Sequence, residues 1–214
     1  MRRTLALSLV STLSLSLLAA CASTGRDSAE STVGGLNELR ADVTAGKAQM
    51  KSTIDSMNAL EKSEGGDLKP RYEAFKKEIS ALESIAAKAK SNGQAMREKG
   101  AAYFKTWEEQ LGTMTNPDIK KRSEERRTEL NKLYAELTTS MDGCRASYEK
   151  FSTDLTDIKK ALDIDLSANG VKNLATPMKT ARGHAGDLDK TLDDVNKKLD
   201  ALAREMNSIQ SPKS

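Results

Sequence analysis

The sequence predicts an all-α protein, an elongated antiparallel up-down-up-down bundle whose helices pack like those of a coiled coil. Three observations predict this fold class. Apolar residues recur every seven positions, in paired series, along most of the chain. Alanine, glutamate, leucine, lysine and arginine make up nearly half of it, a composition typical of long helices. No stretch alternates apolar and polar residues in the manner of a β-strand.

The first helix is expected over residues 36–63. Its two apolar series run three residues apart, as the seam of a heptad repeat requires. One series contains Leu36, Val43, Met50 and Met57, and the other contains Leu39, Gly46, Thr53 and Leu60. The segment 63–67, with its two glycines, interrupts the pattern, and we expect Asp67 to cap the helix that follows.

The second helix is expected over residues 68–113, with Pro70 tolerated in its first turn. The same spacing continues through Tyr72, Phe75, Ile79, Leu82, Ala86, Ala89, Met96, Tyr103 and Trp107. Its middle is lined with the small residues Ala86, Ala89, Gly93 and Gly100. Neighbouring helices are therefore expected either to approach closely there or to pack weakly.

The third helix is expected over residues 117–162. Asn116, Pro117 and Asp118 form a start signature: a capping side chain, a proline at the first helical position and an acid that favours the helix dipole. One sevenfold series contains Leu130, Leu137, Cys144, Phe151 and Ile158, and the other contains Tyr134, Met141, Tyr148, Leu155 and Leu162.

The last helix is expected over residues 167–209, with Ser167 as its N-cap. Its seam is the most regular of the chain, and it comprises Val171, Leu174, Met178, Ala181, Ala185, Leu188, Leu192, Val195, Leu199, Leu202, Met206 and Ile209. Pro177 lies beside this seam, and we expect it to kink the helix or to delay its start.

Residues 1–20 have the features of a secretory signal peptide: Arg2 and Arg3, then an apolar run too short to cross a bilayer as a helix. Leu18-Ala19-Ala20-Cys21 resembles the lipobox of bacterial lipoproteins, which implies cleavage before Cys21 and attachment of fatty acyl chains such as palmitate to it. Several acyl chains form a stable membrane anchor.

Ala22 and Ser23, which follow the cysteine, favour the outer membrane over the inner. The alternative is ordinary secretion with cleavage near Ala20 and a free thiol. Residues 21–35 are polar and small, and are expected to form a lipidated flexible tether. The alternative for its later half, from Ser28, is the frayed start of the first helix.

The charge balance gives little support to a nucleic-acid partner, and we expect none. The chain has 34 Lys+Arg and 31 Asp+Glu, a formal net charge of +3. Two of the cations belong to the predicted leader. A uniformly basic surface, which binding to a polyanion requires, is therefore not indicated.

The sequence offers few residues for catalysis, and we expect no catalytic site, no metal and no cofactor. His184 is the only histidine and is expected to be a solvated residue beside the seam, with pH sensing as the remote alternative. Cys144 falls in a core series and is expected to be a small buried hydrophobe. Asp163 to Gly170 imitates the opening of a calcium loop, but Ala168 and Leu174 stand where that loop needs glycine and a bidentate acid. A capped turn between helices is the expected structure there.

One surface feature predicts a binding site. Basic residues gather where the third helix starts, close to an aromatic residue of the preceding helix, and in this topology they lie at the end of the bundle from which the tether emerges. The set comprises Lys120, Lys121, Arg122, Arg126, Arg127 and Trp107. Such a set suits contact with lipid headgroups or with a protein partner. The alternative is that the aromatic residues belong to the core and the cations to a mixed charged face diluted by Glu124 and Glu125.

Three fragments of the chain carry a family resemblance. They are Gly65-Gly66-Asp67-Leu68, Phe104-x-x-Trp107-Glu108-x-x-Leu111, and the junction from Leu162 to Leu174. They are similar to segments of a bacterial family of helical proteins, predicted to form coiled coils and described only as a domain of unknown function. The resemblance covers nearly the whole chain after the leader. It implies the helical fold and brings no reaction, ligand or catalytic residue with it.

The sequence therefore predicts a non-enzymatic cell-envelope protein, anchored in the outer membrane through lipidated Cys21, whose bundle faces the periplasm as a spacer or docking scaffold. The alternative is a periplasmic sensor or adaptor that binds a specific envelope protein by helix pairing. Because seams rich in methionine and alanine can pair between chains as well as within one, a homo-oligomer is also expected to be possible.

Overall fold

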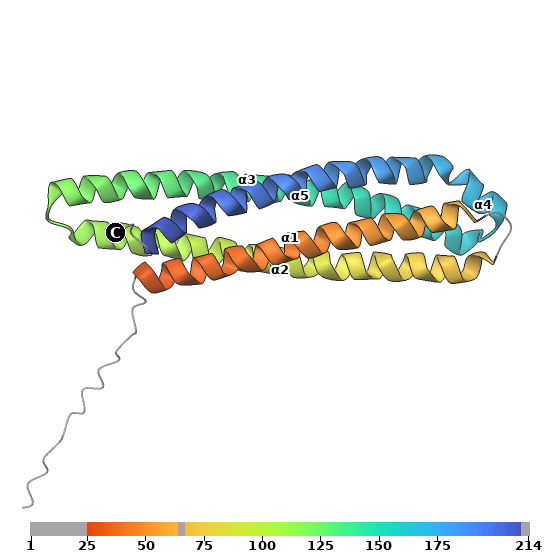
Figure 1. Cartoon of the computed structure of the whole chain (residues 1–214), viewed down its shortest axis with the longest axis horizontal. Coiled ribbons are helices and arrows are strands. Elements are labelled where there is room, and N and C mark those ends of the chain that lie inside the picture. The colour runs from red at the N-terminus through yellow and green to blue at the C-terminus, as the bar shows by residue number, and fades with distance from the viewer. Residues whose placement is uncertain (1–24, 64–66, 211–214) are drawn as a thin grey trace, which may run out of the picture.

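The computed structural model describes residues 25–63 and 67–210, and all of its regular elements within these ranges are helices (Figure 1). The helices are α1 (Gly25–Glu61), α2 (Leu68–Thr113), α3 (Pro117–Ile164), α4 (Ala168–Asn173) and α5 (Ala175–Gln210). The predicted all-α bundle is confirmed. In this part of the chain, no helix combines the length and apolar character that crossing a membrane requires. The predicted signal peptide, residues 1–20, lies outside the described residues.

The four long helices lie side by side in one rod, and short α4 links α3 to α5 at the end where α1 turns into α2 (Figure 1). The most extensive packing is between α1 and α2 and between α3 and α5. Contacts of α1 with α5 and of α2 with α3 join these two pairs. Because α3 alone has 48 residues, the rod is about 70 Å long at 1.5 Å per residue.

The predicted sevenfold series form the core. Many of their large members are entirely removed from solvent, whereas Trp107, Tyr134, Met141 and Tyr148 are half-buried. The members that are 0% exposed include Leu36, Met57, Phe75, Met96, Leu130, Leu137, Phe151, Met178 and Leu199. Burial of one such side chain contributes about 1.5–3 kcal/mol. The rod is therefore stabilised by a narrow apolar seam that runs along its length.

The helix starts predicted from capping residues are confirmed. Side-chain oxygens of Asp67, Asn116 and Ser167 each accept a hydrogen bond from a backbone N–H two or three residues further on. Pro117 occupies the first turn of α3, where its missing N–H removes no helical hydrogen bond. These caps fix where the bundle turns.

The first helix begins earlier than expected. Residues 25–35, assigned to the flexible tether from sequence, are the first turns of α1. Ala29 and Thr32 are buried there at 4% and 1% exposed, and they extend the seam of Leu36 backward with small side chains. The Thr32 hydroxyl donates to the backbone carbonyl of Ser28 at 2.8 Å. The alternative of a helix start from Ser28 therefore describes this segment better than the flexible tether does, and the helix begins three residues earlier still.

The segment expected as one helix over 167–209 is divided at Leu174, where α4 ends and α5 begins. Pro177 lies in the first turn of α5, so the delayed start predicted from this proline is confirmed. Proline lacks the N–H that a helix interior would need at this position. The division lets the chain turn from α3 into α5.

The small residues predicted in the middle of α2 receive large side chains from α3. A Cβ atom added at Gly100 would lie 2.3 Å from the ring of Tyr134, and one added at Gly93 would lie 2.8 Å from the terminal methyl of Met141. The Tyr134 hydroxyl donates to the backbone carbonyl of Arg97 at 3.0 Å, which holds its ring in place. Close approach, and not weak packing, explains Gly100.

We predict that Gly100→Ala destabilises the bundle, whereas Gly143→Ala stabilises it. Alanine is the better helix former by about 1 kcal/mol. At Gly143 nothing lies within 4 Å of the added methyl, so that gain is realised. At Gly100 the methyl overlaps the Tyr134 ring, and overpacking of this kind costs about 1–3 kcal/mol. Urea unfolding followed by circular dichroism measures both effects, and equal stabilisation by the two substitutions would contradict the close packing.

Candidate functional site

At one end of the rod, α2 and α3 extend beyond α1 and α5 (Figure 1). Gly35 of α1 lies against Lys99 of α2, which puts the start of α1 near the level of Trp107. Near the end of α5, the Ser208 hydroxyl accepts a hydrogen bond from Arg126 of α3 at 2.6 Å. Both flanking helices therefore stop short, and a two-helix hairpin continues for about 9 Å more.

We call residues 108–122 the tip: the last turns of α2, the connecting turn and the first turns of α3. The six residues predicted as a contact site lie at or just behind it. They fall into two groups that differ in what they touch.

Trp107 belongs to an aromatic cluster just behind the tip. Its indole N–H donates to the Ser123 hydroxyl of α3 at 2.8 Å, and its ring meets that of Tyr103 edge-on, with centroids 5.5 Å apart. Phe104 packs edge-on against Tyr134 of α3 at the same centroid distance. Burial raises the pKa of Tyr103 to about 12. These aromatic residues join α2 to α3, as the core alternative predicted.

Arg126 and Arg127 also hold the bundle together. The Arg126 guanidinium pairs with the Glu205 carboxylate and donates to the Glu205 carbonyl at 3.1 Å, which fastens α5 to α3. Arg127 pairs with Glu108 of α2 at 2.7 Å. These two cations are therefore engaged within the fold.

Lys120, Lys121 and Arg122 have different surroundings. Lys121 and Arg122 are exposed and Lys120 is half-buried. Within residues 25–63 and 67–210, their side chains form no hydrogen bond or ion pair. Cations in the first turns of a helix oppose its dipole, so they lower its stability slightly. The structure thus separates these three residues from the two paired arginines.

Ile119 is a residue of this site that the sequence analysis missed. Its side chain is 57% exposed, and it is one of two large hydrophobic residues exposed in the described part of the chain. It lies three helical turns before the buried Leu130, on the same side of α3. Following the face of Leu130 back to the first turn of the helix would have identified Ile119 from the sequence. It is uncovered because α1 and α5 end before reaching it.

His184 differs from the expected solvated residue, because it is a contact between helices. Its Nδ1 lies 2.6 Å from an oxygen of Asp154 on α3, and both side chains are partly covered. No sequence pattern relates two residues so far apart in the chain. In the described residues, no group of three or more histidines, cysteines and acids is placed to hold a metal ion.

Cys144 is half-buried and packs against the core. Burial raises the pKa of its thiol, with a smaller opposing effect from a hydrogen bond with Thr191. A thiol that stays protonated is a poor nucleophile. The neighbouring Arg145 pairs with Glu149 and does not activate it. Cys21, the predicted lipidation site, lies outside the described residues.

The turn that imitates a calcium loop is held by internal bonds. The Tyr72 hydroxyl donates to Asp163 at 2.5 Å, and the backbone N–H of Gly170 donates to the Ser167 hydroxyl at 3.0 Å. Lys159 adds an ion pair to Asp163 at 3.2 Å. This is the capped turn that the sequence predicts.

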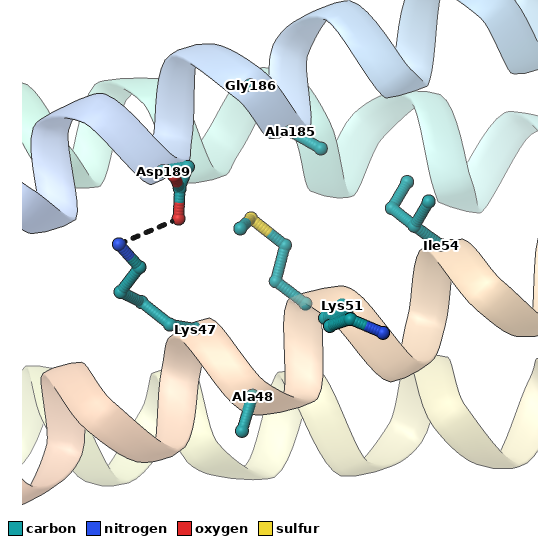
Figure 2. A pocket seen from close by; sticks show the side chains of 8 residues that line it. Lys47, Ala48, Lys51, Ile54, Ala185, Gly186 and Asp189 are labelled. Carbon is teal, nitrogen blue, oxygen red and sulfur yellow. Dashed lines mark ion pairs between the residues drawn. The ribbon is translucent and has the colours of Figure 1, made fainter.

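An open groove of about 530 Å³ lies between α1 and α5 at mid-length (Figure 2). Its lining consists of Lys47, Ala48, Met50, Lys51, Ile54, Ala185, Gly186 and Asp189. Lys47 reaches across it to Asp189 at 2.9 Å, and the dashed line in Figure 2 marks this pair. The small side chains of α5 at this level leave the space open.

We predict that Tyr72→Phe lowers the melting temperature less in acid than at neutral pH. The hydrogen bond from Tyr72, with help from Lys159, lowers the pKa of Asp163. A carboxyl group whose pKa is lowered by folding adds stability above its unfolded pKa of about 3.9, and this stability is lost as the pH falls through the folded value. Thermal melts from pH 7 to pH 2 measure the difference between variant and wild type.

Tyr134→Phe is the matched control, since that hydroxyl bonds a backbone carbonyl and no carboxylate. Its effect on the melting temperature is expected to be the same across this pH range. A Tyr72→Phe effect that stays constant down to pH 2 would contradict the assigned bond.

The comparison with known protein families agrees with the helical resemblance of the sequence. The family described as "Protein of unknown function (DUF2959)" matches residues 19–209, which span almost all of the five helices. No curated protein and no solved structure matches the chain. Since the family match covers most of its length, the chain belongs to the DUF2959 family.

Proposed function

We propose that this protein is a non-catalytic spacer or docking scaffold of the cell envelope, anchored in the outer membrane by lipids on Cys21. The observation that carries the proposal is where the rod begins. The first described helix starts at Gly25, only four residues after the cysteine of a lipobox-like sequence. A rod of about 70 Å attached so closely to an acylated residue would carry its far end well into the periplasm.

The chemistry of the described side chains supports a non-catalytic role. His184 is engaged with Asp154, and the Cys144 thiol is kept protonated by burial. Acyl transfer and related reactions need a nucleophile within reach of an oriented base. Neither of these two residues provides such a pair. The features that this fold provides for function are instead its length and its helical surfaces.

We predict that Cys21→Ser releases the protein from the outer membrane. The substitution removes the sulfur that would carry the diacylglycerol, and a protein without acyl chains has no stable anchor of this kind. Cells are fed radiolabelled palmitate, their membranes are separated on a sucrose gradient, and the protein is detected in each fraction. The wild type is expected to be labelled and to sediment with the outer membrane.

Cys144→Ser is the matched control, because it changes the other cysteine of the chain. It should retain both the label and the membrane fraction. Palmitate label that persists in Cys21→Ser, or a wild-type protein without label, would refute the proposed anchor.

The second candidate is an adaptor that binds a protein partner by helix pairing. The groove between α1 and α5 favours it, because Ile54 in its lining is only half-buried and offers an apolar side chain against which a partner helix can pack (Figure 2). A photo-crosslinking residue at position 54 is expected, for an adaptor, to give one dominant product that changes with growth conditions. The same residue at exposed Lys90 of α2 is the control. A spacer gives no product specific to position 54.

A further inference from the structure

We infer that the tip is a membrane-contacting surface that binds the headgroups of anionic phospholipids. The inference rests on the proposed function in one respect: the anchor at Cys21 determines which end of the rod faces the membrane. It is carried by the juxtaposition of Ile119 with Lys120, Lys121 and Arg122 on the hairpin that extends beyond the other helices.

The three cations have no role inside the fold. They form no side-chain bond with the described residues, and their place in the first turns of α3 opposes the helix dipole. Three such cations adjoin one another in the first turns of α3, so they are available together to an anionic partner outside the fold. Phosphate groups of anionic lipids attract lysine and arginine side chains close to a membrane surface.

Ile119 adds the apolar part of the surface. Its exposed side chain lies directly beside these cations, at the outermost turn of α3. At the boundary between headgroups and acyl chains, the apolar side chain can contact the acyl chains while the cations contact the phosphate groups.

The opposite end of the rod provides a comparison within the same molecule. Ile164, at the end of α3, is 88% exposed. Its chain neighbours are Asp163 and Asp165, and the preceding cations on α3, Lys159 and Lys160, are paired with acids. Ile119, in contrast, is followed directly by three cations that form no such pair within the described residues.

Distances along the chain bring the tip to the membrane. Four residues from Cys21 to Gly25 can span at most about 14 Å. The tip extends about 9 Å past the start of α1. When the rod stands upright, the tip therefore comes within about 5 Å of the level of the anchoring sulfur, which is the thickness of a headgroup layer.

The nearby acids do not cancel this surface. Glu124 and Glu125 lie further along α3, beyond the tip and toward the body of the bundle. Asp118 lies in the first turn, where its carboxylate interacts favourably with the dipole. Glu108, on the α2 side, is paired with Arg127.

The test is sedimentation of the non-acylated chain, residues 22–214, with sucrose-loaded vesicles. This chain keeps every described helix. Vesicles of phosphatidylcholine with 30% phosphatidylglycerol (about one anionic lipid in three, a strongly anionic surface) are compared with pure phosphatidylcholine. Binding is expected only to the anionic vesicles, and it should weaken at high salt because screening shortens the reach of the charges.

The variant K120E/K121E/R122E is expected to reduce partitioning onto anionic vesicles by at least about 100-fold, since each cation near the surface contributes about fivefold and the three factors multiply. It is expected to stay folded, because acids at a helix start favour the dipole. Ile119→Ser leaves the charge unchanged and is expected to reduce partitioning several-fold. Circular dichroism confirms helicity in each variant.

The matched control is K77E/K172E/K179E, which makes the same charge change at exposed positions away from the tip. It should retain vesicle binding. The inference is overturned if the wild type ignores anionic vesicles, if the two triple variants lose binding equally, or if Ile119→Ser and the tip variant both bind like wild type. Since this chain carries no acyl group, the result is independent of whether Cys21 is lipidated.

Discussion

Burial of one continuous apolar seam is the interaction on which the rest of the molecule depends. The seam residues are spaced so that each helix presents a single stripe, and four such stripes meet along the axis of the rod. A narrow stripe leaves most of each helix surface polar, which explains why the chain is so highly charged and yet so fully helical.

Much of the fold could be predicted from sequence because its determinants are local. Asp67, Asn116 and Ser167 cap helices with oxygens that bond N–H groups two or three residues away. The first turns of α1 were expected only as an alternative to the tether, because Ala29 and Thr32 are small and a heptad pattern is recognised mainly by large apolar residues. The position of a residue in the heptad pattern indicates which face of its helix it lies on. It does not indicate where a neighbouring helix ends.

The candidate site shows the same limit. The basic cluster was found from composition, but its division into paired and unpaired cations depends on Glu205 and Glu108, which lie on other helices. Ile119 was missed because its exposure results from the unequal lengths of helices that are distant in the chain. His184 meets Asp154 for the same kind of reason. Contacts across the bundle depend on how far each helix is shifted along its neighbours. A local sequence pattern does not determine this shift.

The unequal packing of the four interfaces has a consequence for assembly. Each tightly packed pair, α1 with α2 and α3 with α5, is joined by a short connection, so each can form as a hairpin from contacts close in sequence. The looser junction of α1 with α5 carries ion pairs at intervals along its length, Arg40–Asp200, Lys47–Asp193 and Arg182–Glu61. A slide of α5 by one heptad would still bring Lys47 opposite Asp200, because both pairs of positions are seven residues apart. The same slide would separate Arg182 from Glu61, a pair whose cation lies on α5, so this pair favours the alignment in which the two hairpins dock.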